Sequence, residues 1–253
     1  MGQFLVTGGT GTLGRVVVED LISKSESVRV LSRRAAPSNA TAPSWAVGDL
    51  RSGDGIDAAV AGIDTIIHCA SKRGDVESAR NLLEAARRAD CSHVVFISIV
   101  GVDKVPLGYY RSKLEVEHRI VDSGVPFTIL RTTQFHNLIA RVMESLARLP
   151  VMVVPARTSF QPIDVREVAA RLVELADGTA SGRVTDMGGP EVRGVRDLAR
   201  SYLRARGRRR LIVPVRLPGP AFAGLRRGGN LAPDHPVGKV GFDQFLVERY
   251  AIA

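Results

Sequence analysis

The stretch MGQFLVTGGTGTLGRVVVEDL (residues 1–21) decides the fold. A short strand-favouring run leads into four glycines, at positions 8, 9, 11 and 14, and then into a segment with helical spacing. Glycine weakens both strands and helices, so its backbone freedom must serve another purpose. Gly9-x-Gly11-x-x-Gly14 has the spacing that makes a tight turn, lets backbone approach a pyrophosphate, and packs helix against strand. The helix N-terminus adds unpaired N–H groups, so the stretch predicts dinucleotide binding.

Further along the chain, apolar runs of strand length alternate with amphipathic stretches of helical length. The strand-like runs are QFLVTG, SVRVLSRR, DTIIHCAS, HVVFISIVG and PFTILRTTQF, and WAVGDL adds a short strand that ends at Asp49. The helical stretches are GRVVVEDLISKS, DVESARNLLEAARRAD, SKLEVEHRIVDSG and NLIARVMESLARL. Continuous apolar strands connected by helices are typical of a parallel sheet covered on both faces. We therefore predict a Rossmann-type, doubly wound parallel α/β sheet.

After about Leu149 this alternation loosens. MVVPARTSFQPIDVREVAARLVELA predicts an edge segment followed by a helix that Asp164 is placed to cap. GRVTDMGG predicts a late strand, and RDLARSYLRARG predicts a helix. The Pro/Gly-rich PGPAFAGLRRGGNLAPDHPVG predicts a loop with one helix. We expect a single domain over residues 1–253, with an NADP-binding core over 1–153. A mixed C-terminal lobe over 154–253 is expected to complete the sheet and to shape a substrate pocket.

Composition fits a protein with one sizeable core. The 253 residues are 45% hydrophobic, and no apolar run approaches the roughly 18 residues of a membrane span. We find no pattern of a secretory signal. Cys69 and Cys91 lie in apolar stretches and are interpreted as core residues in a reducing compartment. The histidines show no metal-ligand spacing. We expect a cytoplasmic monomer or homodimer that acts on a small molecule and binds neither membrane nor metal.

The formal net charge of +9 has three interpretations. Much of the excess lies late in the chain, in LRARGRRR, which ends at Arg210, and in LRRGG. A solvated helix end followed by a polar loop is the simplest interpretation. A nucleic-acid surface would call for interleaved aromatic residues or a known binding motif, and neither is present, so no nucleic acid is expected. The third interpretation is a basic lid that attracts an anionic or phenolic substrate.

The end of the second strand distinguishes the dinucleotides. A carboxylate there would hold the ribose 2′-hydroxyl of NAD, whereas arginine suits a 2′-phosphate. The sequence has Ser32, Arg33 and Arg34, and guanidinium groups pair with phosphate through directed hydrogen bonds. NADP(H) is therefore favoured over NAD(H), unless these arginines simply face solvent.

With these motifs in place, the chain resembles the short-chain dehydrogenase/reductase superfamily, and within it the atypical, NmrA-like NAD(P)H-binding branch. TGGTGTLG matches its TGxxGxxG form, and further similar segments are GDL at 48–50, HCAS at 68–71, FQPIDVREVA at 160–169 and DMGGPE at 186–191. The resemblance is strong to about residue 173 and fades in the C-terminal lobe. It implies contacts with the cofactor from Gly8, Thr10, Gly11, Thr12, Leu13, Ser32, Arg33, Arg34, Asp49, Leu50, Cys69, Ala70, Ser71, Ile99, Lys113, Thr132 and Thr133.

The family's catalytic signature is Tyr-x-x-x-Lys preceded by a serine. Tyr109, Lys113 and Ser98 match it here. A spacing of four brings tyrosine and lysine to one helix face. Free tyrosine has a pKa of about 10, so a nearby cation is needed to make it a proton donor at neutral pH. The resemblance implies that Tyr109 protonates the substrate, Lys113 supports it and Ser98 binds the substrate oxygen. A chance pairing of Tyr and Lys on a helix is the alternative.

The resemblance also implies that Gln134, Phe135 and His136 line the substrate pocket. Asn81 either supports the site through water or faces solvent. The favoured function is an NADPH-dependent reductase that transfers hydride to a small carbonyl- or quinone-type molecule. A regulatory protein that senses NADP(H) without turnover, and an isomerase or epimerase that uses bound cofactor, are the alternatives.

Overall fold

The computed structural model describes residues 2–36, 43–71 and 74–251, and these divide into two compact units. Unit 1 comprises Met1–Ser98, Ser112–Leu130 and Val168–Val184, and unit 2 comprises Ile99–Arg111, Arg131–Glu167 and Thr185–Ala253. Each unit therefore draws on several parts of the chain. The division predicted from the sequence, a core over 1–153 and a lobe over 154–253, follows the chain, whereas these units interleave along it.

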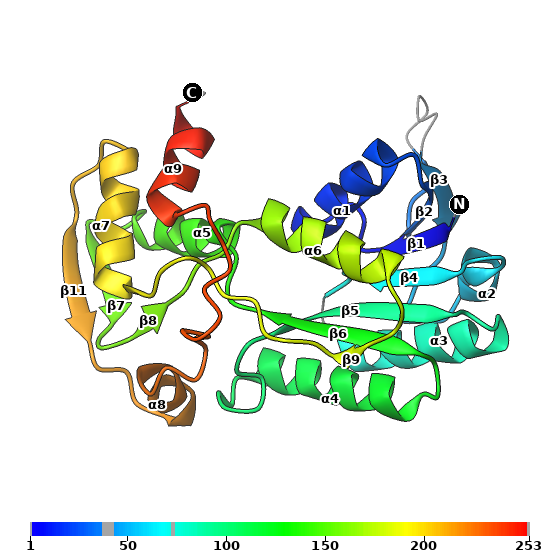
Figure 1. The fold of residues 1–253 in the computed structure, drawn as a ribbon. Coiled ribbons are helices and arrows are strands. Elements are labelled where there is room, and N and C mark those ends of the chain that lie inside the picture. The colour runs from blue at the N-terminus through cyan, green and yellow to red at the C-terminus, as the bar shows by residue number, and fades with distance from the viewer. Residues whose placement is uncertain (1, 37–42, 72–73, 252–253) are drawn as a thin grey trace. The chain divides into compact units, whose positions relative to one another are not determined.

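Unit 1 is built on a seven-stranded sheet (Figure 1). Its strands, in chain order, are β1 (Gln3–Thr7), β2 (Ser27–Ser32), β3 (Ser44–Val47), β4 (Thr65–His68), β5 (His93–Ile99), β6 (Phe127–Thr132) and β9 (Gly182–Arg183). Their order in space is β3-β2-β1-β4-β5-β6-β9, so the chain begins in the middle and winds outward in both directions. The strands pair in parallel, for example Val6 with Val30 and with Ile67. The predicted doubly wound parallel sheet is confirmed.

Helices cover both faces of this sheet. They are α1 (Thr12–Ser23), α2 (Ile56–Val60), α3 (Asp75–Arg88), α4 (Gly108–Asp122) and α6 (Val165–Asp177). Figure 1 shows α1 and α6 on one face and α3 and α4 on the other. β4 is buried along its whole length, and its central residues Ile66 and Ile67 place apolar side chains on both faces of the sheet, as expected for a central parallel strand.

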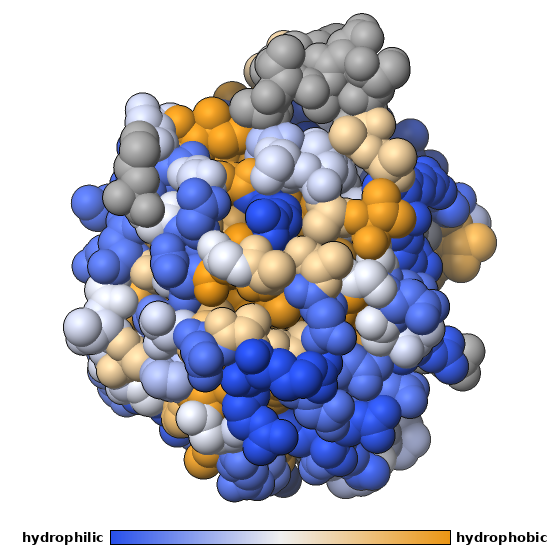
Figure 2. All heavy atoms as spheres, turned by 90° about the vertical axis from the view of Figure 1, so that its right-hand side faces the viewer, coloured by the Kyte–Doolittle hydropathy of each residue, from blue (hydrophilic) through white to orange (hydrophobic). Residues whose placement is uncertain are grey.

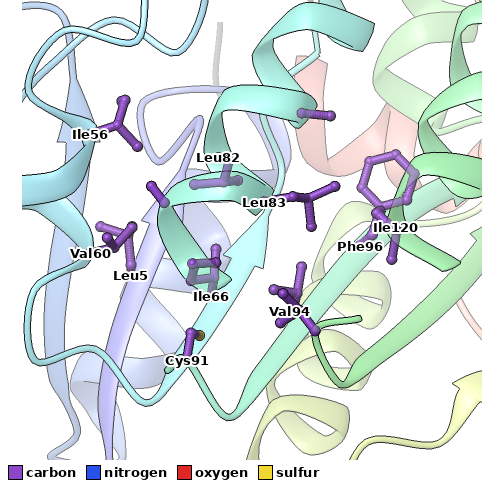
Figure 3. Close-up of a cluster of buried hydrophobic side chains, with 14 of the residues drawn as sticks. Leu5, Ile56, Val60, Ile66, Leu82, Leu83, Cys91, Val94, Phe96 and Ile120 are labelled. Atoms are coloured by element: carbon purple, nitrogen blue, oxygen red, sulfur yellow. The ribbon is translucent and has the colours of Figure 1, made fainter. Parts of the chain in front are cut away.

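The main core of unit 1 lies between the sheet and α3 (Figure 3). Ile66 and Phe96 from the strands are fully buried, and Leu82 from α3 and Ile120 from α4 pack in the same cluster. Cys91 also belongs to it and is a free thiol, as the sequence predicts, whereas Cys69 is half-buried. This core fixes the strand ends from which the functional side chains project.

Unit 2 has its own core and two small sheets. Its elements are α5 (His136–Leu146), β7 (Val151–Pro155), β8 (Ser159–Phe160), β10 (Arg193–Gly194), α7 (Val195–Ala205), β11 (Leu211–Val215), α8 (Pro220–Arg226) and α9 (Phe242–Tyr250). β7 pairs in parallel with β11, and β8 pairs antiparallel with β10. Met152, Tyr202 and Phe242 are buried together where α5, α7 and α9 meet. The helices expected over RDLARSYLRARG and in the Pro/Gly-rich loop are present as α7 and α8.

The surface is largely polar where unit 1 presents α2 and the amino ends of its strands. Figure 2 shows hydrophilic residues over most of this face, with hydrophobic ones in small areas between them. Within the described ranges, no helix has the length and apolar composition that crossing a bilayer requires.

Candidate functional site

The glycine-rich turn after β1 is packed too closely for side chains. Gly8 has φ +68°, and a Cβ there would lie 2.7 Å from the backbone nitrogen of Ala70. A Cβ on Gly9 would lie 2.9 Å from a methyl group of Val30, and one on Gly14 would collide with the carbonyl oxygen of Gly8. The side chain of an alanine at any of these three positions would therefore force either the neighbouring backbone or strand β2 to move. The predicted roles of tight turn and close helix packing are met by this geometry.

The start of α1 offers free N–H donors. Gly11 is the N-cap, its own N–H donates to the carbonyl of Gly8 at 2.8 Å, and no side chain caps the helix. Thr10, Gly11 and Thr12 are exposed, and Leu13 is buried beneath them. A helix N-terminus without a side-chain cap leaves backbone N–H groups for an anion, and the dipole favours negative charge there. This cradle fits the pyrophosphate of a dinucleotide.

The end of β2 carries two exposed positive charges. Arg33 and Arg34 are exposed, and the backbone N–H of Arg34 donates to the Ser32 hydroxyl at 3.1 Å. Within the residues that the structure describes, no carboxylate lies within 4 Å of either guanidinium group. Ser32, Arg33 and Arg34 are thus arranged as a turn whose cations are available to a phosphate.

The GDL segment after β3 is held by α3. The side-chain amide of Asn81 donates to the carbonyl oxygens of Leu50 and Arg51, at 2.9 and 3.0 Å. Asp49 accepts from the backbone N–H of Arg51, and Leu50 packs on the core. Asn81 is half-buried and binds the backbone of this segment directly, without a bridging water.

The segment after β4 is also tied to the start of the sheet. Thr7 Oγ1 lies 2.6 Å from His68 Nδ1, and it accepts from the N–H of Ala70 at 3.3 Å. Burial and the charge of Lys113 lower the pKa of His68 to about 3, so this imidazole is neutral near pH 7. Burial raises the pKa of Cys69 to about 12 despite the opposing effect of Lys113, so its thiol stays protonated. These groups position the loop rather than supply charge.

Lys113 on α4 is buried beside a carboxylate. Only 2% of its surface is exposed, and its Nζ lies 3.8 Å from Asp75 Oδ2 and 4.6 Å from the centre of the Phe96 ring. Ser71 donates to the same carboxylate oxygen at 3.1 Å. Burial lowers the pKa of Lys113, and Asp75 is the largest opposing influence. Asp75 therefore favours the charged ammonium in an environment that disfavours it.

Ser98 at the end of β5 is engaged within unit 1. It is 1% exposed, and its hydroxyl donates to the carboxylate of Glu117, which is also buried. Glu117 lies one turn beyond Lys113 on α4, so the two face the same side of the helix. A hydroxyl has a single proton to donate, and this one is directed to Glu117.

Two neighbouring tyrosines at the start of α4 have different environments. Tyr109 is 49% exposed, and it lies one turn before Lys113 on the same helix. Tyr110 is buried, its hydroxyl is 3.3 Å from the amide nitrogen of Gln134, and burial raises its pKa. Ser98 and Lys113 belong to unit 1 and Tyr109 to unit 2. Of the two tyrosines, only Tyr109 is exposed enough to meet a ligand.

The residues after β6 are held inside unit 2. Thr132 and Thr133 are buried, and the Thr133 hydroxyl donates to the carbonyl of Gln161. Gln134 donates to the Asn230 carbonyl at 3.3 Å, and its own oxygen lies 3.4 Å from the Asn230 amide nitrogen. Their predicted contacts with cofactor and substrate stay predictions, as does that of Ile99 at the end of β5.

His136 and Phe135 begin α5. The His136 ring is fully buried, lies 2.9 Å from the Val240 carbonyl oxygen and stacks on Phe245. Burial lowers the pKa of His136 below its ordinary value. Phe135 is half-buried at the N-cap position. The placement of His136 is that of a core residue, and substrate contact by either side chain stays a prediction.

Two buried carboxylates, Asp75 and Glu117, are absent from the sequence prediction. Asp75 resembles an ordinary first-turn acid of α3, since the lysine that it meets is far along the chain. Glu117 does carry a local indication, because it continues the spacing of four from Tyr109 through Lys113.

A comparison with protein-family models finds a match over most of the chain. The model is described as NAD(P)H-binding, and it covers residues 8–177. Its span includes the glycine cradle, the arginines after β2, the HCAS segment and the Tyr109–Lys113 pair.

Among curated proteins, three relatives illustrate the range of similarity. A (4-alkanoyl-5-oxo-2,5-dihydrofuran-3-yl)methyl phosphate reductase of Streptomyces griseus is 30% identical over 81% of this chain and 74% of its own length. Photosystem II assembly factor Ycf39 of Trieres chinensis is 30% identical over 66% of this chain, which spans only 57% of it. Quinone oxidoreductase 2 of Escherichia coli is 28% identical over 50% of this chain and 46% of its own.

Among solved structures, the NADPH complex of an NADPH-dependent quinone oxidoreductase from Escherichia coli superposes with a TM-score of 0.84 at 18% identity, covering 98% of this chain and all of the other. A UDP-glucose 4-epimerase of Thermus thermophilus with NAD gives a TM-score of 0.75 at 21% identity, covering 99% of both. At these identities the likeness establishes the fold.

Proposed function

The chain belongs to the NAD(P)H-binding family, and from this premise we propose that it is an NADPH-dependent reductase of a small quinone- or carbonyl-type molecule. The observation that carries the proposal is the exposed Tyr109 one helical turn from the buried, Asp75-paired Lys113. When bound, NADPH supplies a hydride to an acceptor carbon. The chain's own part is to hold the coenzyme, keep a cation near the tyrosine and deliver a proton.

The choice of NADPH over NADH rests on the end of β2. Arg33 and Arg34 carry two guanidinium groups and no acidic partner within the described ranges, and no carboxylate ends the strand where NAD enzymes place one. A 2′-phosphate dianion would pair with these groups through charge-assisted hydrogen bonds. Gly8, Gly11 and Gly14 would receive the pyrophosphate at the start of α1.

Tyr109 is assigned the proton transfer. Its phenol donates a proton to the substrate oxygen as the oxygen gains electron density, and the Lys113 ammonium stabilises the phenolate left behind. Ser98 donates its hydroxyl proton to Glu117, so a bond from Ser98 to a substrate oxygen would require that contact to break. The proposal therefore rests on Tyr109 and Lys113, and it gives Ser98 the secondary role of supporting α4.

The test follows NADPH oxidation by the purified protein with 1,4-benzoquinone, 1,4-naphthoquinone and aromatic aldehydes and ketones. Wild type is expected to turn over at least one class. Tyr109→Phe should lower kcat/KM by about 100-fold or more, since that is the usual contribution of a positioned acid. Tyr110→Phe is the matched control, because it removes a buried hydroxyl from the neighbouring residue, and it should stay within a few-fold of wild type.

Either of two results would contradict the proposal. Turnover that survives Tyr109→Phe unchanged would remove Tyr109 from the mechanism. Tight NADPH binding with no turnover on the whole panel would favour a binding protein without catalysis, the second candidate. The similarity to Ycf39, which is named an assembly factor, is the observation that supports this second candidate, a binding protein without catalysis.

A further inference from the structure

Six arginines surround one cavity in unit 2. Its volume is about 430 Å³, and it is lined by Arg196, Arg200, Leu203, Arg204, Arg208, Arg209, Arg210, Leu211 and Ile212. Three of these arginines come from α7, and three come from the turn that connects α7 to β11. The apolar part of the lining consists of a leucine and an isoleucine from β11 and the buried Leu203 of α7. An arginine-rich run in the sequence thus becomes one concave, basic surface with an apolar patch.

A solvated helix end explains only part of this arrangement. Arg204 and the three arginines of the turn lie at the C-terminus of α7, where the helix dipole favours cations. Arg196 lies in the first turn, where the dipole disfavours a cation, and Arg200 follows four residues later on the same exposed face. Like charges four apart on a helix destabilise it. The preference of helix ends for charge therefore does not account for Arg196 and Arg200.

In the part of the chain that the structure describes, the hydrogen bonds of the cavity arginines go to neutral groups. Arg204 donates to the Ser201 hydroxyl at 3.1 Å, and Arg210 donates to the backbone carbonyls of Ala147 and Arg209. For Arg196, Arg200, Arg208 and Arg209, no carboxylate of the described chain lies within 4 Å.

The nearby carboxylates form ion pairs with a different arginine, Arg193. Arg193, which is buried just before α7, lies 2.6 Å from Asp197, 2.8 Å from Asp243 and 3.5 Å from Glu191. The same unit therefore neutralises its buried arginine and leaves the cavity arginines positive.

We propose that this cavity binds a small molecule that carries at least two phosphate groups and an apolar portion. Guanidinium groups match phosphate oxygens through paired hydrogen bonds, and several arginines around one space can share a polyanion. The cavity volume lies within the range of small-molecule sites, which is about 300–1,000 Å³. Leu203, Leu211 and Ile212 provide the apolar contact. The site uses none of the residues assigned to NADPH, so it is a second anion site.

A nucleic acid is the less suitable ligand. Surfaces that bind single strands interleave aromatic side chains among basic ones so that bases can stack. The cavity lining contains no aromatic residue, and Tyr202, the one aromatic residue of α7, is buried in the core of unit 2.

Inorganic tripolyphosphate is the probe for this site. Titration calorimetry is run at constant ionic strength with NADPH at saturation, so that the coenzyme cradle is occupied. Wild type should bind one tripolyphosphate saturably. Arg196→Gln/Arg200→Gln should weaken this binding at least 10-fold while changing NADPH affinity by less than about two-fold, the small effect of the lost net charge. Arg87→Gln/Arg227→Gln removes the same charge from exposed positions outside the cavity, and it should bind tripolyphosphate within two-fold of wild type.

Three outcomes would overturn the proposal. Equal weakening in the two double variants would mean that only the net charge of the protein attracts the probe. Absence of saturable binding to wild type would remove the site. Tighter binding of a short RNA or DNA than of tripolyphosphate, lost in Arg196→Gln/Arg200→Gln, would assign the surface to nucleic acid instead.

Discussion

Lys113 illustrates how one buried charge depends on one neighbour. An ammonium that is 2% exposed has lost nearly all of its hydration, which by itself favours the neutral amine. Asp75 offsets this loss through its charge, and the face of the Phe96 ring adds a weaker attraction. If Lys113 supports the Tyr109 phenolate, the working pH range of the protein is set partly by a residue that touches no substrate. Asp75 is then a positioning residue.

Replacing Asp75 with Asn tests this dependence. The substitution removes the charge that raises the Lys113 pKa, so that pKa should fall further below its ordinary value. The ammonium would be lost at a lower pH, and the alkaline limb of the kcat/KM profile for NADPH oxidation should move down by about one pH unit or more.

Asp75→Glu, which restores the charge, should return the limb toward the wild-type position. Asp57→Asn is a second control, because it removes an exposed carboxylate that pairs with Arg88. If the Asp75→Asn profile overlays that of wild type, Asp75 does not sustain the charge of Lys113.

At the scale of elements, the two helix starts of greatest interest are capped differently. α1 begins at Gly11 with no side-chain cap, which leaves its N–H groups for a ligand. α6 begins after Asp164, whose Oδ1 accepts from the backbone N–H of Arg166 at 2.8 Å, as the sequence predicts. The Arg166 guanidinium also binds both oxygens of this buried carboxylate. α6 therefore stabilises its own start, whereas α1 leaves its first N–H groups available, as the proposed coenzyme site requires.

Removing the α6 cap should cost stability in a pH-dependent way. Burial raises the pKa of Asp164, but hydrogen bonds from Arg166 outweigh it and hold the pKa below its ordinary value. A lowered folded-state pKa means that the stabilisation is complete above the unfolded value of about 3.9 and is lost as pH falls through the folded value. Asp164→Ala should lower the free energy of unfolding by about 1–2 kcal/mol at pH 7.

Urea unfolding at a series of pH values measures this effect. The difference between wild type and Asp164→Ala should be constant near neutrality and shrink below about pH 4. Asp234→Ala, at an exposed carboxylate, should change the free energy of unfolding by less than about 0.5 kcal/mol. A difference of the same size at pH 3 and pH 7 would show that the Asp164 charge does not matter.

At the scale of the whole molecule, local patterns predict unit 1 better than unit 2. Strands β4 and β5 carry runs of apolar residues on both faces, Ile66 and Ile67 in β4 and Val94 to Ile97 in β5, because both faces of the sheet are covered, and these runs are visible in the sequence. β11 is not predicted, because Pro214 argues against a strand and its partner β7 lies far back in the chain. The candidate site likewise has parts that local sequence patterns predict and parts that they do not. The glycine turn is a local motif, whereas the Lys113–Asp75 and Ser98–Glu117 contacts join distant segments.

The net charge of the whole molecule and the local arginines after β2 should affect coenzyme binding in separable ways. A net charge of +9 attracts NADPH and NADH alike over long distances, and salt screens this attraction. Arg33 and Arg34 should discriminate between them, because only NADPH carries the 2′-phosphate. We therefore expect Arg33→Gln/Arg34→Gln to reduce the preference for NADPH over NADH at least 10-fold, since hydrogen bonds to charged groups contribute about 1.5–3 kcal/mol each.

Dissociation constants for both coenzymes, measured by fluorescence titration between 50 and 500 mM NaCl, separate the two effects. Arg196→Gln/Arg200→Gln loses the same charge and serves as the control. This variant should weaken the binding of both coenzymes equally and only slightly, so the ratio of their dissociation constants should stay at the wild-type value. The salt dependence of NADH binding should survive in both variants, because it reflects the remaining net charge. If Arg33→Gln/Arg34→Gln keeps the wild-type preference at low salt, these arginines do not bind the 2′-phosphate, and the preference for NADPH must come from other residues.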